Sequence, residues 1–247
     1  MNPVARLILG RYTWHANTLP PDAYSGSGKI ESLFGSEIWN EIYGKTVIDF
    51  GCGVGREALE LSRRGAARVI GVETLPASLE SARQNLSRAA LGNCEFSSET
   101  DTQADIIFSI DSFEHFSDPA GILCAMAAML KPGGRVFVSF GPPWYHPKGL
   151  HMPLFPWAHI VFSERSIMEW RARSKTDGAV RYCEVAGGLN QMSIAKFQRL
   201  VNASPLRFQR MKTIPIRAFR RLHCRVTREF FTSVVQAVLI QRDARLR

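Results

Sequence analysis

The stretch DFGCGVG, residues 49–55, decides how this chain is expected to fold. It follows a short apolar, β-branched run at residues 46–50, which predicts a buried strand, and it precedes a helical pattern at residues 55–64. Glycine permits positive φ angles and lets a ligand approach the backbone, and the first turn of a helix offers unpaired amide hydrogens. A strand, a glycine turn and a helix in this order predict a binding site for a nucleotide-like ligand.

The same alternation of strand and helix patterns continues after the glycine turn. Asp118 followed by Pro119 is typical of an N-cap and a first helical position. Strands alternating with helices favour a doubly wound, mostly parallel α/β sheet with helices on both faces. Further strands are expected at residues 68–72, 93–96, 104–110, 135–140, 207–215 and 231–240, and further helices at residues 30–43, 75–90, 119–130 and 193–203.

The spacing of the glycines indicates which ligand the turn binds. Dinucleotide sites use G-x-G-x-x-G, whereas Gly51, Gly53 and Gly55 follow the pattern G-x-G-x-G. Asp49 places a carboxylate beside the turn, which suits an ammonium group better than a pyrophosphate. Glu73 ends the next strand, where an acid can bond both hydroxyls of a ribose. An ammonium and a ribose without phosphate describe S-adenosyl-L-methionine.

Four motifs in this order resemble the class I S-adenosylmethionine-dependent methyltransferases, over residues 47–140. They are residues 49–55, 72–73, 110–115 and 130–136. The resemblance implies a Rossmann-like, seven-stranded sheet whose last strand is antiparallel, with S-adenosylmethionine as the cofactor. It also implies that Asp49 and the three glycines border the methionyl part and that Glu73 holds the ribose.

Two further cofactor contacts are expected from the same resemblance. Residues 97–100, Ser-Ser-Glu-Thr, lie where the family holds adenine, and Ser98 is the candidate there. This segment is shorter than the family's and lacks its acid-then-hydrophobic pattern. Asp111, at the carboxyl end of the fourth strand, is also expected beside the cofactor.

Methyl transfer from a sulfonium needs mainly alignment of the acceptor, and a general base only for a weakly acidic hydroxyl or a protonated amine. Glu114-His115 resembles the E-H pair of small-molecule methyltransferases, including ubiquinone-biosynthesis O-methyltransferases, so both residues are candidates for catalysis. Some relatives bind a divalent metal through E-x-x-E-H, where this chain has Asp111 in the first place. Alternatively, Glu114 and His115 fix the loop, and we expect no metal ion.

A proline- and aromatic-rich insertion at residues 141–192 interrupts the alternation. It follows the carboxyl end of a strand, where open α/β sheets bind ligands, so we expect it to be a substrate lid. His146 and His151 are candidates for the base, or else hydrogen-bond within the loop. The aromatic residues either cover an apolar or aromatic acceptor or form a core that holds the insertion; they are Trp144, Tyr145, Phe155 and Trp157.

The basic charge is concentrated at the C-terminal end of the chain. Of the net charge of +9, residues 205–247 carry 11 Lys and Arg against 2 Asp and Glu. Within them, residues 216–230 have apolar residues at helical spacing with arginines between, which predicts a basic amphipathic helix. Such a helix either contacts an anionic membrane or an acidic substrate, or packs on the sheet with its arginines in water. No nucleic-acid motif is present, so nucleic acid is not expected, although the charge keeps RNA as an alternative.

The composition is ordinary for a globular protein, with 45% hydrophobic and 21% charged residues. We find neither a run of about 18 apolar residues nor a signal-peptide pattern, and we expect a cytoplasmic protein. Five scattered cysteines argue against a zinc site or a disulfide framework. We expect an N-terminal extension at residues 1–45 and a catalytic domain at residues 46–247.

The sequence therefore predicts a methyltransferase that acts on a small molecule, at an oxygen atom. An RNA or protein methyltransferase that uses the basic segment is the first alternative. A non-catalytic module that keeps the fold is the second. A nicotinamide-dependent reductase is opposed by Asp49 and by the spacing of the glycines. The sequence does not indicate the oligomeric state.

Overall fold

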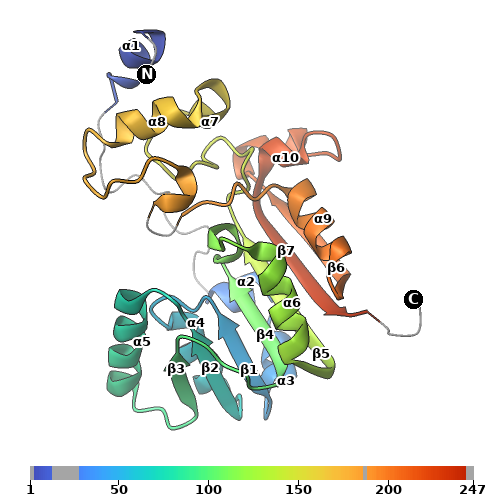
Figure 1. Ribbon diagram of the computed structural model, residues 1–247. Coiled ribbons are helices and arrows are strands. Elements are labelled where there is room, and N and C mark those ends of the chain that lie inside the picture. Colours follow the sequence, from blue (N-terminus) through green and yellow to red (C-terminus); the bar gives the residue numbers. More distant parts are fainter. Residues whose placement is uncertain (1–2, 13–27, 186–187, 243–247) are drawn as a thin grey trace.

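The computed structural model describes residues 3–12, 28–185 and 188–242 (Figure 1). In this part of the chain seven strands form one sheet in the order β3-β2-β1-β4-β5-β7-β6. The strands are β1 (Thr46–Phe50), β2 (Arg68–Val72), β3 (Cys94–Ser97), β4 (Ala104–Ile110), β5 (Leu130–Phe140), β6 (Leu206–Pro215) and β7 (Thr232–Gln241). The first five are parallel, and β7 runs antiparallel to both β5 and β6. The predicted fold class is confirmed.

Helices cover both faces of the sheet. They are α1 (Pro3–Leu9), α2 (Lys29–Phe34), α3 (Ile38–Ile42), α4 (Arg56–Arg63), α5 (Pro76–Ala89), α6 (Pro119–Met129), α7 (Ala158–Val161), α8 (Glu164–Arg171), α9 (Ile194–Ala203) and α10 (Arg228–Phe231). Helices α2 to α5 contribute to the apolar cluster of one face, and α6 and α9 to that of the other. None of the described helices has the length and apolar character that a bilayer crossing requires.

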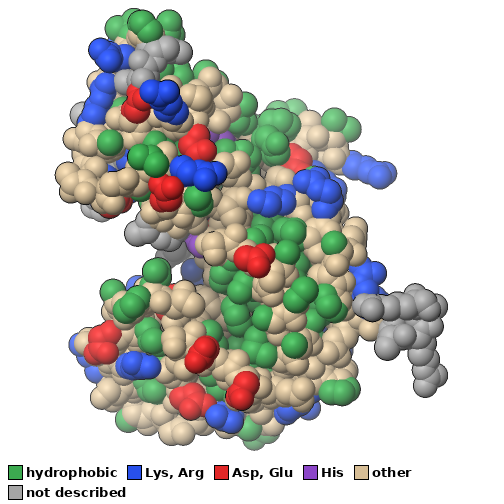
Figure 2. Space-filling view, viewed as in Figure 1, with side chains coloured by type: hydrophobic (Ala, Val, Ile, Leu, Met, Phe, Trp, Pro, Cys, Tyr) green, Lys and Arg blue, Asp and Glu red, His purple; other side chains and the backbone are tan. Residues whose placement is uncertain are grey.

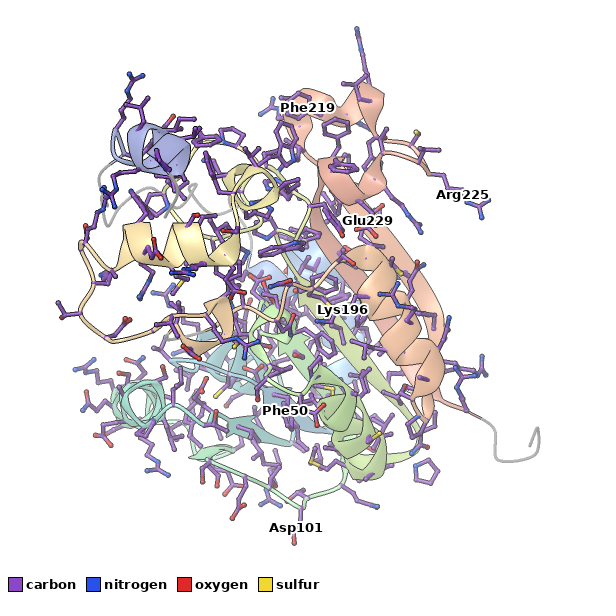
Figure 3. The ribbon with its side chains drawn as sticks, turned by 45° about the horizontal axis from the view of Figure 1, so that its top comes forward. Phe50, Asp101, Lys196, Phe219, Arg225 and Glu229 are labelled. Carbon is purple, nitrogen blue, oxygen red and sulfur yellow. The ribbon has the colours of Figure 1, made fainter. Side chains whose placement is uncertain are left out.

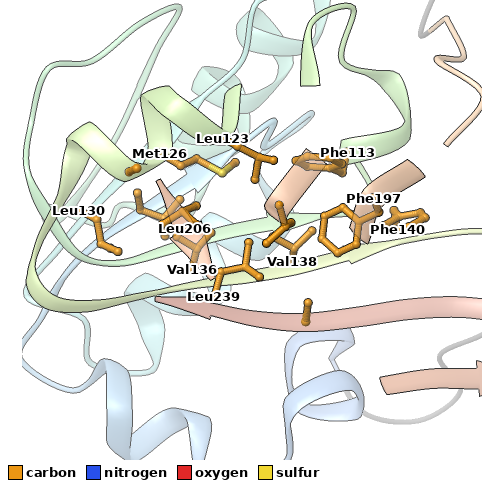
Figure 4. Packing of buried hydrophobic residues seen from close by; sticks show 14 of the residues in the cluster. Phe113, Leu123, Met126, Leu130, Val136, Val138, Phe140, Phe197, Leu206 and Leu239 are labelled. Carbon is orange, nitrogen blue, oxygen red and sulfur yellow. The ribbon is translucent and has the colours of Figure 1, made fainter. Parts of the chain in front are cut away.

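The core is divided by the pleat of the strands, which sends alternate side chains to opposite faces. On the face of α6 and α9, Phe197 meets Phe140 and Phe113 with ring centroids 5.1 and 5.2 Å apart (Figure 4). On the other face, Phe108 stacks on Phe137 at 5.0 Å. Burial of such side chains is the main favourable term that holds the layers together.

Local signals place the helix starts where the sequence predicts them. The Asp118 side chain accepts a hydrogen bond from the Gly121 amide at 2.9 Å, directly before Pro119 begins α6. Ser193 caps α9 in the same way, through the Lys196 amide at 3.1 Å. These caps satisfy amide groups that the first helical turn leaves unpaired.

The insertion predicted after β5 forms a cap, which we define as residues 141–192. The cap has its own apolar cluster, which includes Trp170 and Tyr182, and α1 packs against it through Ala5 and Leu9. The Trp170 indole also donates a hydrogen bond to the carbonyl of Tyr12 at 2.9 Å.

Two of the aromatic side chains of the insertion belong to the core of the cap. Trp144 and Phe155 pack against its buried cluster, and Trp144 lies 4.6 Å from the ring of His159. Trp157 donates its indole hydrogen to the Tyr145 carbonyl at 2.9 Å. These residues therefore hold the insertion together, which is one of the two roles that the sequence left open.

One predicted helix is wrong. Residues 216–230 do not form a continuous amphipathic helix but a 3-10 helix at Arg217–Leu222 and the four-residue α10. The chain turns between them, where Thr227 hydrogen-bonds the Cys224 amide and the Leu222 carbonyl, and His223 lies between the hydroxyls of Thr213 and Thr232. A straight helix would not return the chain from β6 to β7.

One strand boundary also differs from expectation. The strand expected at residues 135–140 begins at Leu130, as β5, because residues 131–134 between the expected helix and strand continue the sheet. Within the expected extension at residues 1–45, Ile30 of α2 and Ile38 of α3 are buried against the sheet. The turn-rich stretch at residues 19–28 lies, except for Gly28, outside the described residues.

Candidate cofactor and active site

The three glycines of the turn have positive φ angles of 80°, 54° and 83° at Gly51, Gly53 and Gly55. A Cβ atom on Gly51 would lie 2.7 Å from the Cβ atom of Ser112, and one on Gly55 would lie 2.4 Å from the ring of Phe96. Those two glycines therefore allow close packing. A Cβ on Gly53 would meet nothing within 4 Å. Gly53 is thus the position where the backbone is open to a ligand.

Glu73 is fixed beside this open backbone. One carboxylate oxygen accepts the Gly53 amide hydrogen at 3.0 Å, and the other accepts that of Leu75 at 2.8 Å. Each oxygen has a second lone pair for a further donor. The carboxylate is therefore oriented and can still accept from the two hydroxyls of a ribose.

Asp49 is buried near the carboxyl end of β1, between Gly71 of β2 and Phe108 of β4. Burial, and next the nearby Glu57 carboxylate, raise the pKa of Asp49 well above its usual value. Within the described part of the chain its Oδ2 atom has no hydrogen-bond partner. A buried acceptor without a donor fits a cationic ligand such as S-adenosylmethionine at this turn.

Lys29 is a charged residue of the site that sequence reasoning missed. Its Nζ atom lies 3.0 Å from Oδ2 of Asp111 and 3.8 Å from Oε1 of Glu57. Asp111 follows β4 with φ of 50°, and its amide donates to the Ser139 carbonyl of β5 at 3.0 Å. Lys29 precedes the glycine turn by about 20 residues, and no motif marks it.

Glu114 is buried in the short 3-10 helix Phe113–His115 that follows β4. Its Oε1 atom accepts the Gly141 amide hydrogen at 3.0 Å, whereas its Oε2 atom has no partner among the described residues. Burial raises the pKa of Glu114 to about 7. Its carboxyl group therefore changes charge near neutral pH.

His115 is exposed, and its Nδ1 atom lies 3.0 Å from the carbonyl oxygen of Gly188 in the cap. A carbonyl oxygen only accepts, so Nδ1 carries a hydrogen. In the neutral ring, Nε2 is then the atom with a lone pair. The structure thus gives His115 the tautomer that a base acting through Nε2 requires.

The structure brings His151 beside His115, with ring centroids 5.8 Å apart. Nε2 of His151 faces the Pro142 carbonyl at 3.2 Å, and burial lowers its pKa to about 4. His146 instead accepts the Lys148 amide hydrogen through Nδ1 at 2.9 Å, and burial lowers its pKa to about 4 as well. Of the two cap histidines predicted from sequence, His151 thus lies next to the E-H pair, and both rings are neutral at pH 7.

Asn190 is a second residue that the sequence did not indicate. Its side-chain amide donates to the carbonyls of Phe113 and Phe116, both at 2.9 Å, and its backbone amide donates to the Glu114 carbonyl at 2.9 Å. The end of the cap therefore clamps the 3-10 helix that carries Glu114 and His115.

The remaining predicted residue, Ser98, is exposed directly after β3, at the same edge of the sheet as Glu73. The Glu73 amide donates to the carbonyl of neighbouring Ser97 at 3.0 Å. No cluster of three metal-ligating side chains occurs in residues 3–12, 28–185 and 188–242. Figure 2 shows the molecule hollowed between the cap and the half of the sheet that carries the glycine turn.

Comparison with known proteins agrees with this arrangement. Residues 48–138 match the family model described as a methyltransferase domain. A ubiquinone biosynthesis O-methyltransferase of Neisseria meningitidis serogroup C is 31% identical over 158 residues, which cover 60% of this chain and 65% of that protein. The matched part is thus less than two thirds of that relative's length.

Two solved structures share the fold. An S-adenosylmethionine dependent methyltransferase from Mesorhizobium loti superposes with a TM-score of 0.54 at 17% identity, covering 82% of this chain and 93% of that one. The [4+2]-cyclase SpnF gives a TM-score of 0.54 at 13% identity, covering 83% and 79%. Residues 48–138 thus match a methyltransferase domain, and the chain shares its fold with a solved S-adenosylmethionine dependent methyltransferase.

Proposed function

We propose that this chain transfers a methyl group to an oxygen atom of a small-molecule acceptor. The observation that carries the proposal is that Gly53, Glu73 and His115 follow the carboxyl ends of three neighbouring strands, β1, β2 and β4, and that His151 of the cap lies beside His115. Gly53 and Glu73 are suited to hold the cofactor, and the histidine pair supplies a nitrogen base. That the Neisseria relative is named an O-methyltransferase supports oxygen as the acceptor atom.

The residues around the turn would hold S-adenosylmethionine, which supplies a methyl group activated by its sulfonium. Glu73 would accept the ribose hydroxyls, and the cationic methionyl part would favour the ionised form of Asp49, which burial disfavours in its absence. Lys29 is the cation available to a ligand carboxylate, at the cost of its contact with Asp111. Ser98 and Asp111 are retained as contacts because both follow strands at this edge.

His115 is the residue that we assign to proton removal. Its Nδ1 hydrogen is held by the Gly188 carbonyl, so Nε2 accepts the proton of the acceptor hydroxyl. His151 contributes a neutral ring beside it, and Glu114 holds the end of β4 against Gly141. Glu114 and Asn190 are thus positioning residues, because both act through the 3-10 helix that carries His115.

The cap would cover the acceptor as a lid. This role is supported by two contacts of the cap: the carbonyls of Gly188 and Pro142 orient the rings of His115 and His151. An acceptor bound under it would meet the aromatic and aliphatic residues of the cap, which favours an apolar or aromatic molecule.

Formation of S-adenosylhomocysteine from S-adenosylmethionine with a panel of phenols and catechols tests this function. We expect turnover with at least one small hydroxylated aromatic compound. His115→Gln should lower kcat by roughly a hundredfold or more while the affinity for S-adenosylmethionine stays unchanged. Turnover on RNA or protein but on none of the small molecules would contradict the proposal, and so would full activity of His115→Gln.

A further inference from the structure

Exposed apolar side chains gather at the cap end of the molecule, on three elements far apart in the sequence. We define the cap-end surface by α1, α7 and residues 216–231, which lie along the same end of the fold in two views (Figures 1 and 3). Its exposed apolar side chains include Val4, Leu7, Val161, Leu222, Val226 and Phe230. Val226 is 84% exposed and Val161 67%. A cluster of apolar side chains that are this exposed is typical of an interaction surface.

The same surface is basic. Residues 216–231 contain five arginines and one acid, Glu229. Within the described residues, none of these arginines forms a salt bridge with an Asp or Glu. Arg225 points away from the fold in Figure 3. Figure 2 shows hydrophobic and basic side chains next to each other along this end.

The acids near this surface are already engaged. Both carboxylate oxygens of Glu229 accept the amides that begin α9, from Ile194 at 3.0 Å and Ala195 at 2.7 Å. In the cap, Glu169 pairs with Arg165 and Asp177 with Arg171. The positive charge of residues 216–231 is therefore not neutralised locally.

The basic side chains of β6 have a structural explanation that does not apply to residues 216–231. β6 is an edge strand, and basic side chains such as Arg210 and Lys212 on an edge oppose pairing with another chain. Residues 216–231 are not an edge strand. They are built onto the fold by Glu229, by the contact of Phe219 with Phe231 at 5.0 Å and by that of Phe230 with Tyr145 at 5.7 Å.

We propose that the cap-end surface docks on an anionic phospholipid bilayer. Arginines would contact the lipid phosphates, and the protruding Leu222, Val226 and Val161 would enter the interface between headgroups and acyl chains. Exposed aliphatic side chains between the arginines favour a bilayer over RNA, because aliphatic groups contribute little to phosphate binding, whereas RNA is bound through phosphate contacts and aromatic stacking.

Docking in this orientation would place the cap against the bilayer. The cap connects to the E-H pair through Gly188 and Asn190, so an acceptor partitioned into the membrane would lie close to the cap side of the site. The proposal concerns binding and does not require methyl transfer. The chain can therefore fail to bind vesicles while the proposed methyl transfer is confirmed. It can also bind vesicles while the proposed methyl transfer is refuted.

Sedimentation of the purified chain with lipid vesicles tests the docking. We compare phosphatidylcholine vesicles with vesicles containing about one third phosphatidylglycerol, at an ionic strength of about 0.1 M. We expect binding to the anionic vesicles that falls as salt is added. Combined Arg221→Gln and Arg225→Gln should weaken binding by roughly tenfold to thirtyfold, and combined Leu222→Ser and Val226→Ser by about tenfold.

Matched controls lie near the amino ends of the parallel strands, away from the cap. Combined Lys45→Gln and Arg88→Gln removes the same number of charges, and Tyr43→Ser removes an exposed apolar side chain at the start of β1. Both controls should bind vesicles like the unmodified chain. If they weaken binding as much as the cap-end variants do, the effect is one of net charge and the docking surface is refuted.

A second readout uses the exposed cysteines. An environment-sensitive fluorophore on Cys224, with Cys124 and Cys183 replaced by serine, should shift to the blue when anionic vesicles are added. The same fluorophore on Cys124 of α6 should not shift. Equal binding to both kinds of vesicle overturns the proposal. The proposal is also overturned if total RNA displaces the chain from the vesicles. It is overturned as well if the unmodified chain is a dimer in solution and the combined Leu222→Ser and Val226→Ser variant is a monomer.

Discussion

The carboxylate of Glu73 accepts the amide hydrogen of Gly53 at 3.0 Å, which joins the end of β2 to the glycine turn after β1. The same carboxylate accepts the Leu75 amide hydrogen at 2.8 Å, before α5 begins. One acid therefore sets the relative position of two loops that border the proposed cofactor site. Preorganisation of this kind reduces the ordering cost that a ligand has to overcome.

Replacing Glu73 by alanine is expected to weaken S-adenosylmethionine binding by about tenfold, because a charged hydrogen-bond acceptor is lost. Glu73→Gln keeps one acceptor oxygen but turns an NH2 group toward one of the two amides. Its affinity for S-adenosylmethionine should therefore lie between that of the unmodified chain and that of Glu73→Ala. Isothermal titration measures both. An unchanged affinity in Glu73→Ala would show that the carboxylate does not contact the cofactor.

Gly53→Ala tests whether the open backbone of the turn is where the ligand lies. The new methyl group would point into the space that the structure leaves open, so cofactor affinity should fall by at least tenfold. Gly44→Ala is the control, because Gly44 also has a positive φ, of 69°, and also faces open space.

Both alanine variants should lose about 1 kcal/mol of stability through the left-handed backbone. Only Gly53→Ala should lose cofactor affinity. Equal affinities in the two variants would place the ligand elsewhere.

Asp49→Asn separates stability from binding. The buried Asp49 carboxylate lies near Glu57 and Glu73, and its raised pKa shows that the charged form is disfavoured in the folded chain. The isosteric asparagine removes that charge, so the free energy of unfolding at pH 8 should stay level or rise. Affinity for the cationic cofactor should fall by about tenfold. A loss of stability without a loss of affinity would make Asp49 purely structural.

Glu114 should make stability depend on pH. Burial raises the pKa of Glu114 from 4.5 to about 7, so the folded chain binds the proton more tightly than the unfolded chain. The contribution is fully present below about pH 4.5 and is lost as the pH rises through about 7, by on the order of 3 kcal/mol.

Glu114→Gln keeps an acceptor for the Gly141 amide and does not titrate. Relative to the unmodified chain, it should therefore gain stability between pH 5 and pH 8 in denaturant unfolding. Glu80→Gln, at an exposed position of α5, is the control. Its difference in unfolding free energy from the unmodified chain should stay constant with pH. A constant difference for Glu114→Gln as well would mean that its carboxyl group is not kept protonated by burial.

Most of the sheet could be predicted because buried strands and glycine turns are local signals. Residues 46–50 are apolar and β-branched, and Asp118 before Pro119 predicts the start of α6. The motifs then predicted which strand ends carry the cofactor site. These features need no knowledge of distant contacts, which is why they could be read from the sequence.

What could not be predicted depends on long-range contacts. Lys29 at the start of α2 contacts Asp111 after β4, and Asn190 contacts the 3-10 helix from the far end of the cap. Neither contact leaves a pattern in the chain. Helical spacing at residues 216–230 was misleading, because closure of the β6–β7 connection overrides local periodicity and leaves Leu222 and Val226 exposed.

Isothermal titration of the purified chain with S-adenosylmethionine and S-adenosylhomocysteine tests the central claim most directly. Micromolar binding of both, weakened by Glu73→Ala and by Gly53→Ala but not by Gly44→Ala, is the result that the structure predicts. Binding of neither compound, or binding of a nicotinamide dinucleotide instead, would contradict the assignment of this turn as an S-adenosylmethionine site.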